Sequence, residues 1–292
     1  MRILRVLNRF CCIALLSIFS LSTTAQYYDS LNFVDLQWQK EKIAKGVKLY
    51  SKHFNSKNLF RSNQYITYVK IKKRANVFEI AADPKTLKTT SDFATESNAV
   101  AAVNGNFFDM KNGGAVDYTK KNGQIINANR VQSNQQRAFH QKAGVVITNG
   151  SLQIVKWDGF ANWEENLSED DVMLGGPLLY LKNVFEKLDS TSSFTMTRHP
   201  RTCVGVTKRG KVIMLVADGR NANARGLNLF ELSKVMRWLK CVSAINFDGG
   251  GSSALWILNK GVVNHPSDNA KWDNKGERKV ANILLVKSRK QK

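Results

Sequence analysis

The chain has 292 residues, enough for one large domain, and carries 44 Lys and Arg against 23 Asp and Glu. A net charge of +21 favours acidic partners such as phosphate-bearing glycans and anionic envelope polymers. The lysines are dispersed along the chain, as on a solvated surface, so we rank nucleic acid low as a partner.

Residues 1–25 have the pattern of a signal peptide. Three arginines precede an apolar run at residues 10–21, and small residues at 23–25 precede a cleavage site ahead of Gln26. The run is too short to span a bilayer, and no other segment is long enough. We therefore expect an exported protein, periplasmic or secreted, without stable membrane insertion after cleavage. Removing three arginines from 44 basic residues leaves 41 against 23 acidic ones, so the mature chain stays strongly basic.

Beyond the leader, we expect an N-terminal lead-in segment at residues 26–60 and one domain at residues 61–292. From Gly46 onward apolar and polar residues alternate with the period of β-strands. Residues 86–97 are polar and are expected to be a connection. Hairpins combined with a single helix-linked crossover predict an α+β fold: a mixed, largely antiparallel sheet with helices packed outside.

Two hairpins are predicted. Residues 143–155 form one, because Asn149 and Gly150 are the favoured pair for a tight turn between two apolar strands. Residues 201–207 and 211–217 form the second.

A helix then begins at Asn228, a good N-cap, with Glu231 completing a capping box, and runs to about residue 240. It leads into another apolar strand at residues 242–247, as in a crossover unit. If the strands before and after the helix are parallel, Asp218 and Asp248 follow their carboxyl ends at one edge of the sheet, where ligands bind in α/β sheets.

The most informative stretch is residues 246–253, in which Asp248 precedes three consecutive glycines and two serines. Glycine loses more conformational entropy on folding than any other residue type. Three glycines in a row therefore indicate that the loop needs positive φ or the close approach of another group. The alternative is a tight structural turn capped by Asp248. Catalytic residues concentrate on such loops, which favours a functional site.

Other candidate ligands and cross-links are less specific. Cys203 and Cys241 form one disulfide or remain two buried thiols. No Cys and His spacing is typical of a zinc site. Asp268, Asp273 and Asn274 are candidate Ca²⁺ ligands, although their spacing matches no EF-hand loop.

Several of these motifs together resemble the phosphodiester glycosidase family. The resemblance covers roughly residues 60–287, and Asn106 departs from the family pattern, which usually has a small residue there. The matching segments are residues 103–108, 175–177, 201–205, 217–220, 225–229, 244–252, 265–268 and 277–280.

The resemblance implies hydrolysis of a sugar-1-phosphodiester, such as a GlcNAc-α-1-phosphate diester in a phosphorylated glycan or envelope polymer, with release of sugar and a phosphomonoester. Cleavage at an anomeric carbon passes through an oxocarbenium-like state, which a carboxylate can stabilise or attack. Asp248 and Asp218 are the catalytic candidates, as nucleophile or base and its partner in either order. The substrate-binding candidates are Arg201, Arg220, Arg278, Asn104, Asn106, Gly249, Gly250, Gly251 and Ser252.

Each binding candidate has a structural alternative. Guanidinium groups match phosphate bidentately, but Arg201 and Arg278 equally suit structural ion pairs, and Arg220 fits either role. Asn104 and Asn106 suit sugar contacts or turns. The alternative for the whole chain is a non-catalytic envelope polysaccharide-binding protein. Two carboxylates at the mouth of an anion site favour the enzyme.

Overall fold

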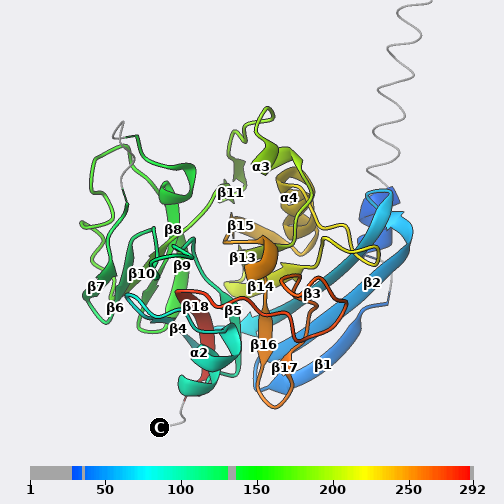
Figure 1. Cartoon of the computed structure of the whole chain (residues 1–292), viewed down its shortest axis with the longest axis horizontal. Helices are drawn as coiled ribbons and strands as arrows, with labels where there is room; N and C mark the ends of the chain where they lie inside the picture. The colour runs from blue at the N-terminus through cyan, green and yellow to red at the C-terminus, as the bar shows by residue number, and fades with distance from the viewer. Residues whose placement is uncertain (1–27, 35–36, 131–135, 290–292) are drawn as a thin grey trace, which may run out of the picture.

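A computed structural model describes residues 28–34, 37–130 and 136–289, so the predicted signal peptide lies outside the described residues. Three antiparallel sheets and a few short helices make up the fold (Figure 1), which confirms the predicted α+β class. Among the described residues, no helix is both long and apolar enough to cross a bilayer.

The largest sheet has eight strands, and every adjacent pair in it is antiparallel. Its two outer strands at one edge, β1 and β2, come from the segment that the sequence assigned to the lead-in. In spatial order the strands are β1 (Gln39–Ala44), β2 (Val47–Leu59), β3 (Ser62–Lys72), β14 (Lys211–Ala217), β13 (Arg201–Thr207), β15 (Cys241–Asn246), β11 (Leu178–Leu181) and β12 (Val184–Phe185).

Two five-stranded sheets complete the β structure. The first contains β7 (Gln124–Asn127), β6 (Thr119–Lys121), β10 (Asp171–Leu174), β8 (Ala143–Thr148) and β9 (Ser151–Lys156). The second contains β17 (Gly261–Val262), β16 (Leu255–Ile257), β5 (Ala101–Asn104), β18 (Asn282–Ser288) and β4 (Asn76–Ala82).

Both predicted hairpins are present. In the β8–β9 pair, Val145 lies opposite Ile154 and Ile147 opposite Leu152, and the turn is at Asn149 and Gly150. The β13–β14 hairpin pairs residues 201–206 with residues 217–212. The alternation of apolar residues was sufficient to predict these local pairings, because a hairpin turn determines the register of its strands.

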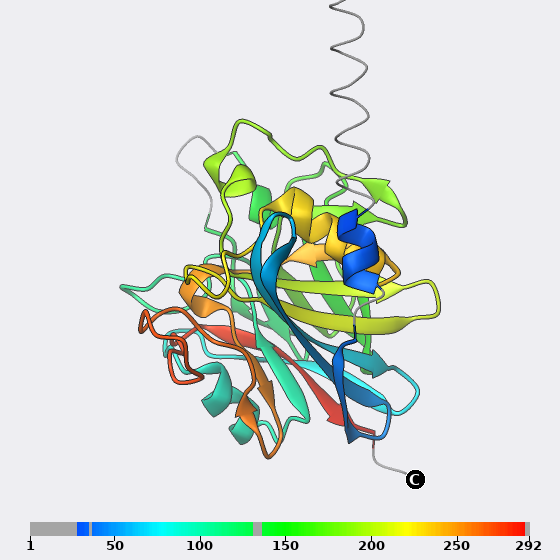
Figure 2. The ribbon, with the colours of Figure 1, turned by 90° about the vertical axis from the view of Figure 1, so that its right-hand side faces the viewer.

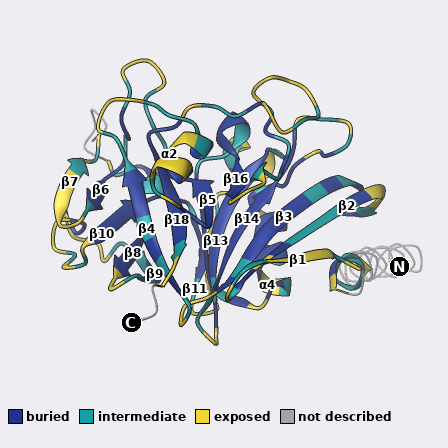
Figure 3. Cartoon of the chain, turned by 90° about the horizontal axis from the view of Figure 1, so that it is seen from below, coloured by how far each residue is buried: buried dark blue, intermediate teal, exposed yellow. Residues whose placement is uncertain are grey.

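The three sheets pack around one shared hydrophobic core, which is the dark interior of Figure 3. The outer face of the eight-stranded sheet is covered by α4 (Leu229–Trp238) and by the helical residues 28–34, which lie beside α4 in Figure 2. Phe33 connects these two helices through ring contacts with Trp38, Phe54 and Trp238. Burial of these apolar faces is the main favourable contribution to stability.

Helix α4 begins as the sequence predicts. The Asn228 side chain accepts from the Glu231 N–H at 2.8 Å, and the Glu231 carboxylate accepts from the Asn228 N–H at 3.1 Å. The helix connects β14 to β15. Both of these strands are antiparallel to β13, which lies between them, and therefore they run parallel to each other.

Four short helical elements of the described chain complete the fold. Residues 86–97, expected to be a connection, contain α2 (Thr90–Glu96), with a Thr89–Asp92 capping box. The polar sequence concealed this helix because only its Phe93 and Ala94 face the sheet. The others are α3 (Ser193–Met196), η1 (Phe139–Gln141) and η2 (Gly250–Ser252).

The two cysteines of the described chain, Cys203 and Cys241, are free buried thiols rather than a disulfide. Cys203 lies opposite Asn246, whereas Cys241 lies opposite Thr207 at the other end of the β13–β15 pair. The two thiols are therefore separated along the strands.

Leu232 of α4 is fully buried against the outer face of the eight-stranded sheet. We expect Leu232→Ala to lower the free energy of unfolding by about 2–5 kcal/mol, because it leaves a cavity in this packing. Urea denaturation of the purified protein measures the change. Lys234→Ala on the same helix is the control and should change stability by less than about 0.5 kcal/mol. Equal effects of the two substitutions would show that α4 does not depend on this contact.

Candidate active site

Several predicted site residues lie at one end of the central strands of the eight-stranded sheet, and we call this end of the strands the edge. Asp218 follows the carboxyl end of β14, and Asp248 lies two residues beyond the end of β15. Because β13 is antiparallel to both strands, its first residue, Arg201, lies at the same edge, opposite Ala217. The crossover through β14, α4 and β15 (Figure 1) thus brings residues that are up to 47 positions apart in sequence to the same end of the central strands.

Asn104, at the end of β5, joins a second sheet to this edge. Its Nδ2 donates to the Asp248 carbonyl at 2.7 Å, while the Asp248 N–H donates to the Gly105 carbonyl at 3.1 Å. Its Oδ1 accepts from the Thr202 hydroxyl at 2.6 Å and from the Ala254 N–H at 3.2 Å. The fully buried amide is therefore occupied in positioning the backbone of Asp248.

Asn106 is engaged in a similar way. Its Oδ1 accepts a hydrogen bond from Asn282 Nδ2 at 2.6 Å. Its Nδ2 donates to the Thr119 hydroxyl at 3.1 Å. Gly105 between the two asparagines leaves no room for a side chain, since a Cβ would lie 2.0 Å from Asn282 Oδ1. Asn104 thus holds the backbone of Asp248, whereas Asn106 connects the segment after β5 to the first residues of β18 and β6.

Asp248 itself has an unusual electrostatic environment. Withdrawal from solvent raises the pKa of its carboxyl group to about 6. The negative charge of Asp117 acts in the same direction, whereas the Ser252 hydroxyl, the Gly249 N–H and the charge of Arg278 lower this pKa. The Gly249 N–H donates to Asp248 Oδ1 at 2.9 Å. A carboxyl group with such a pKa is ionised at neutral pH yet close to its protonated form, as suits acid–base or nucleophilic chemistry.

The glycine loop, residues 249–251, is packed so closely that none of its members has room for a Cβ atom. At Gly249 the atom would lie 2.6 Å from the Pro200 carbonyl oxygen, and at Gly250 it would lie 2.9 Å from Arg220 Nη2. At Gly251 it would lie 2.4 Å from Asp268 Oδ1 and 2.6 Å from Arg278 Nη2. Gly250 also has a φ of 61°. The loop that joins Asp248 to Ser252 therefore packs against two guanidinium groups, those of Arg220 and Arg278.

The three predicted arginines differ in what their guanidinium groups contact. The buried Arg201 donates to the carbonyl oxygens of Leu227, Phe194 and Thr197, and it lies over the Phe194 ring. Burial lowers the pKa of Arg201 to about 10, with a further contribution from Arg220. Arg201 thus holds the loop around α3 in place.

Arg278 pairs with Asp268, to which its Nε donates at 2.9 Å. Arg220 is exposed, and among the described residues it has no carboxylate within 4.0 Å. Arg220 is consequently the candidate with an uncompensated charge beside the glycine loop.

Asp218 is buried and fully engaged. It accepts from Asn264 Nδ2 at 2.8 Å, from the His265 N–H at 2.9 Å and from His265 Nδ1 at 2.8 Å. Burial raises the pKa of Asp218, and the bonds from His265 and Asn264 oppose that shift. The His265 ring stacks on Trp272, with the centroids 3.8 Å apart. Asp218 therefore anchors the loop that follows β17 beside the glycine loop.

A second aspartate–histidine pair, Asp117 and His140, lies close to Asp248 and was not predicted from the sequence. His140 Nδ1 lies 2.6 Å from Asp117 Oδ1, and the His140 ring packs 4.7 Å from the ring of Phe107. The two residues are separated by 23 positions and stand in segments without a periodic pattern. Only the folded arrangement, in which Asp117 influences the pKa of Asp248, connects them to the site.

The candidate Ca²⁺ ligands point to separate partners. Asp268 pairs with Arg278, Asp273 accepts from Asn269 Nδ2 at 2.9 Å, and Asn274 Nδ2 donates to the Asn264 carbonyl at 2.7 Å. Within the described ranges, no group of three or more His, Cys, Asp or Glu side chains is arranged to hold a metal ion.

Comparison with solved structures gives the same fold. The catalytic domain of zebrafish N-acetylglucosamine-1-phosphodiester α-N-acetylglucosaminidase, auto-inhibited by its pro-peptide, matches with a TM-score of 0.64 at 18% identity, covering 87% of this chain and 88% of that one. A Synechocystis protein matches with a TM-score of 0.64 at 14% identity, covering 87% of this chain and 64% of that one.

Comparison of sequences identifies the family. Mouse N-acetylglucosamine-1-phosphodiester α-N-acetylglucosaminidase is 28% identical over 207 residues, which is 68% of this chain. The chain spans only 39% of the length of that relative. The family model for phosphodiester glycosidase matches residues 97–287, which include Asn104, Asp218 and Asp248. The chain therefore belongs to the phosphodiester glycosidase family.

Proposed function

We propose that the chain is an exported hydrolase that cleaves a sugar-1-phosphodiester at the anomeric carbon, with a GlcNAc-α-1-phosphodiester in a glycan or envelope polymer as the substrate. One observation carries the proposal: the carboxyl group of Asp248, with its raised pKa, lies beside a glycine loop that packs against Arg220 and Arg278. This arrangement combines a carboxylate for the anomeric centre with cations for a phosphate.

In the proposed reaction, the bond from the anomeric carbon to the phosphate oxygen breaks, and water supplies the oxygen that replaces it. Asp248 either attacks the carbon to form a covalent intermediate, which water then hydrolyses to release the sugar and free the carboxylate, or accepts the proton from water as that water attacks the carbon. The leaving group is a phosphomonoester with a second pKa near 6, so it departs with little help from a general acid. Arg220, with its uncompensated charge, stabilises the phosphate, as preorganised cations do in phosphoryl-group recognition.

The remaining residues position Asp248. Asn104 holds its backbone, and the bonds that occupy Asp218 make that residue an anchor for His265 rather than a reacting group. The Asp117–His140 pair borders the site from the side of Phe107. We infer that Asp248 alone supplies the reacting carboxylate.

The first test is turnover. Purified protein should release free GlcNAc from a GlcNAc-α-1-phosphodiester, and Asp248→Asn should lower kcat by about 10³-fold or more, because it removes the reacting carboxylate. Asp170→Asn, which removes an exposed carboxylate, is the matched control and should keep full activity. Binding without turnover across a panel of such diesters would instead support the non-catalytic polysaccharide-binding alternative.

The pH dependence of kcat/KM provides a second test. Asp248 must be ionised to act, so kcat/KM should rise with pH and reach a plateau above its pKa of about 6. His199 is a second group that could produce an acid limb, because burial and then the charges of Arg201 and Arg220 lower its pKa below 6.5. The acid limb should persist in His199→Gln. Its disappearance in that variant would assign the limb to His199.

Stability offers a third test that does not depend on turnover. The pKa of an aspartate is about 3.9 in the unfolded chain and that of Asp248 is about 6 in the fold, so the fold favours the neutral carboxyl. The linked stability is complete below about pH 4 and is lost as pH rises through about 6. Asparagine does not titrate, so Asp248→Asn should escape this loss. The free energy of unfolding of the variant minus that of the original protein should therefore be about 2 kcal/mol larger at pH 8 than at pH 4. Urea denaturation measures this, with Asp170→Asn as control. An unchanged difference between the two pH values would rule out the raised pKa.

A further inference from the structure

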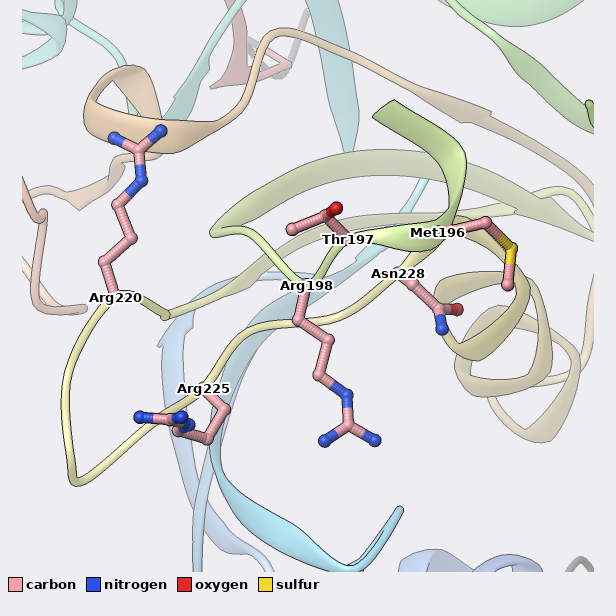
Figure 4. Close-up of a pocket in the computed structure, with 6 residues that line it drawn as sticks. All are labelled: Met196, Thr197, Arg198, Arg220, Arg225 and Asn228. Carbon is pink, nitrogen blue, oxygen red and sulfur yellow. The ribbon is translucent and has the colours of Figure 1, made fainter. Parts of the chain in front are cut away.

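A pocket with a volume of about 580 Å³ opens beside the glycine loop (Figure 4). Arg220 belongs to both places, because its guanidinium group packs against Gly250 while its side chain lines the pocket. None of the lining residues is acidic, and three are arginines. They are Met196, Thr197, Arg198, Arg220, Arg225 and Asn228, and we call this space the Arg225 pocket.

The charges in the Arg225 pocket are not balanced by the protein. Arg198 is neutralised, since its Nε donates to both carboxylate oxygens of Glu231 at 3.1 and 3.0 Å. Arg225, like Arg220, has no carboxylate within 4.0 Å in the part of the chain that the structure describes. Two of the arginines that line the pocket therefore lack a protein counter-charge, which favours anionic ligands.

The two uncompensated guanidinium groups do not converge on one point. In Figure 4 the Arg220 side chain extends away from Arg225, and the Gly250 contact places its guanidinium group at the glycine loop. A single phosphate bound by Arg220 at the glycine loop would leave Arg225 without a partner. The geometry thus separates one anion site at Arg220 from a second at Arg225.

The loop that carries Arg220 and Arg225 is held rigidly by the strands β2 and β3. The Arg225 N–H donates to the Asn63 carbonyl at 2.9 Å, and Asn63 Nδ2 donates to the Ala222 carbonyl at 3.1 Å. His53 Nε2 lies 3.0 Å from the Asn223 carbonyl oxygen. Rigid attachment on both sides of the loop preorganises Arg225 and reduces the ordering entropy that binding would cost.

We propose that the Arg225 pocket binds a second phosphate of the same substrate, so that the enzyme acts on a glycan chain with repeated phosphates rather than on an isolated diester. This inference rests on the proposed function. The volume of the pocket lies within the range that accommodates a small ligand group, and guanidinium groups recognise phosphate through two parallel hydrogen bonds.

The test compares two GlcNAc-α-1-phosphodiesters, one with a methyl aglycone and one with a 3-phosphopropyl aglycone. The original protein should have a higher kcat/KM for the phosphorylated substrate. Arg225→Ala should reduce this preference about tenfold or more, mainly through KM, because a hydrogen bond to a charged group is lost. Arg225→Lys keeps the charge but not the planar guanidinium group, so its preference should lie between those of the original protein and Arg225→Ala. Arg209→Ala removes a charge from the exposed β13–β14 turn and should leave the preference unchanged.

Two outcomes overturn the proposal while leaving the proposed function intact: no preference for the phosphorylated aglycone, or equal effects of Arg225→Ala and Arg209→Ala. If neither substrate is turned over, the proposed function fails, and calorimetric titration with 1,3-propanediol bisphosphate tests the pocket alone. Binding that is lost in Arg225→Ala and kept in Arg209→Ala would support the pocket. Absent binding, or equal binding by both variants, would overturn it.

Discussion

The buried amide of Asn104 is the contact on which the rest of the site depends. Its two ends link the backbone of Asp248, the Thr202 hydroxyl and the Ala254 N–H, so one side chain connects β5 to the loop after β15 and to β13. A buried amide without these partners would cost about 1–3 kcal/mol for each unsatisfied group, which makes the arrangement strongly preferred over alternatives. The position of the candidate carboxylate is therefore determined by packing between sheets and not by its own loop.

The glycine loop follows from the same constraint. Once Asn104 fixes Asp248, the chain must turn between the Pro200 carbonyl, Arg220 and the Arg278–Asp268 pair, and at each step a Cβ atom would overlap one of these groups. Arg220 and Arg278 thus occupy the space that a Cβ atom at Gly250 or Gly251 would need. The two arginines make one side of the site basic, and Asp248 supplies a carboxyl group with a raised pKa on the other side. The site therefore suits an anionic substrate that reacts with a carboxylate or with water.

Local signals predicted most of the fold, whereas the assignment of the site residues stays a prediction. The Asn149–Gly150 turn and the Asn228–Glu231 cap act over a few residues, and both are present as predicted. Helix α2 was missed because its apolar contacts are two residues in a polar stretch. The partners of Arg201 and Asp218, and the pairing of Asp117 with His140, depend on contacts between distant segments, which no local pattern contains.

The two free thiols have a practical consequence. Cys203 and Cys241 lie on adjacent central strands, are almost inaccessible, and have pKa values that burial raises, to about 12 for Cys241. An alkylating reagent needs a thiolate in contact with solvent, so neither cysteine can react until the strands β13 and β15 separate. The rate of thiol labelling therefore reports how often the central sheet opens, at the strands that carry Arg201 and Asp248. The protein contains its own chemical probe for the conformational stability of the candidate active site.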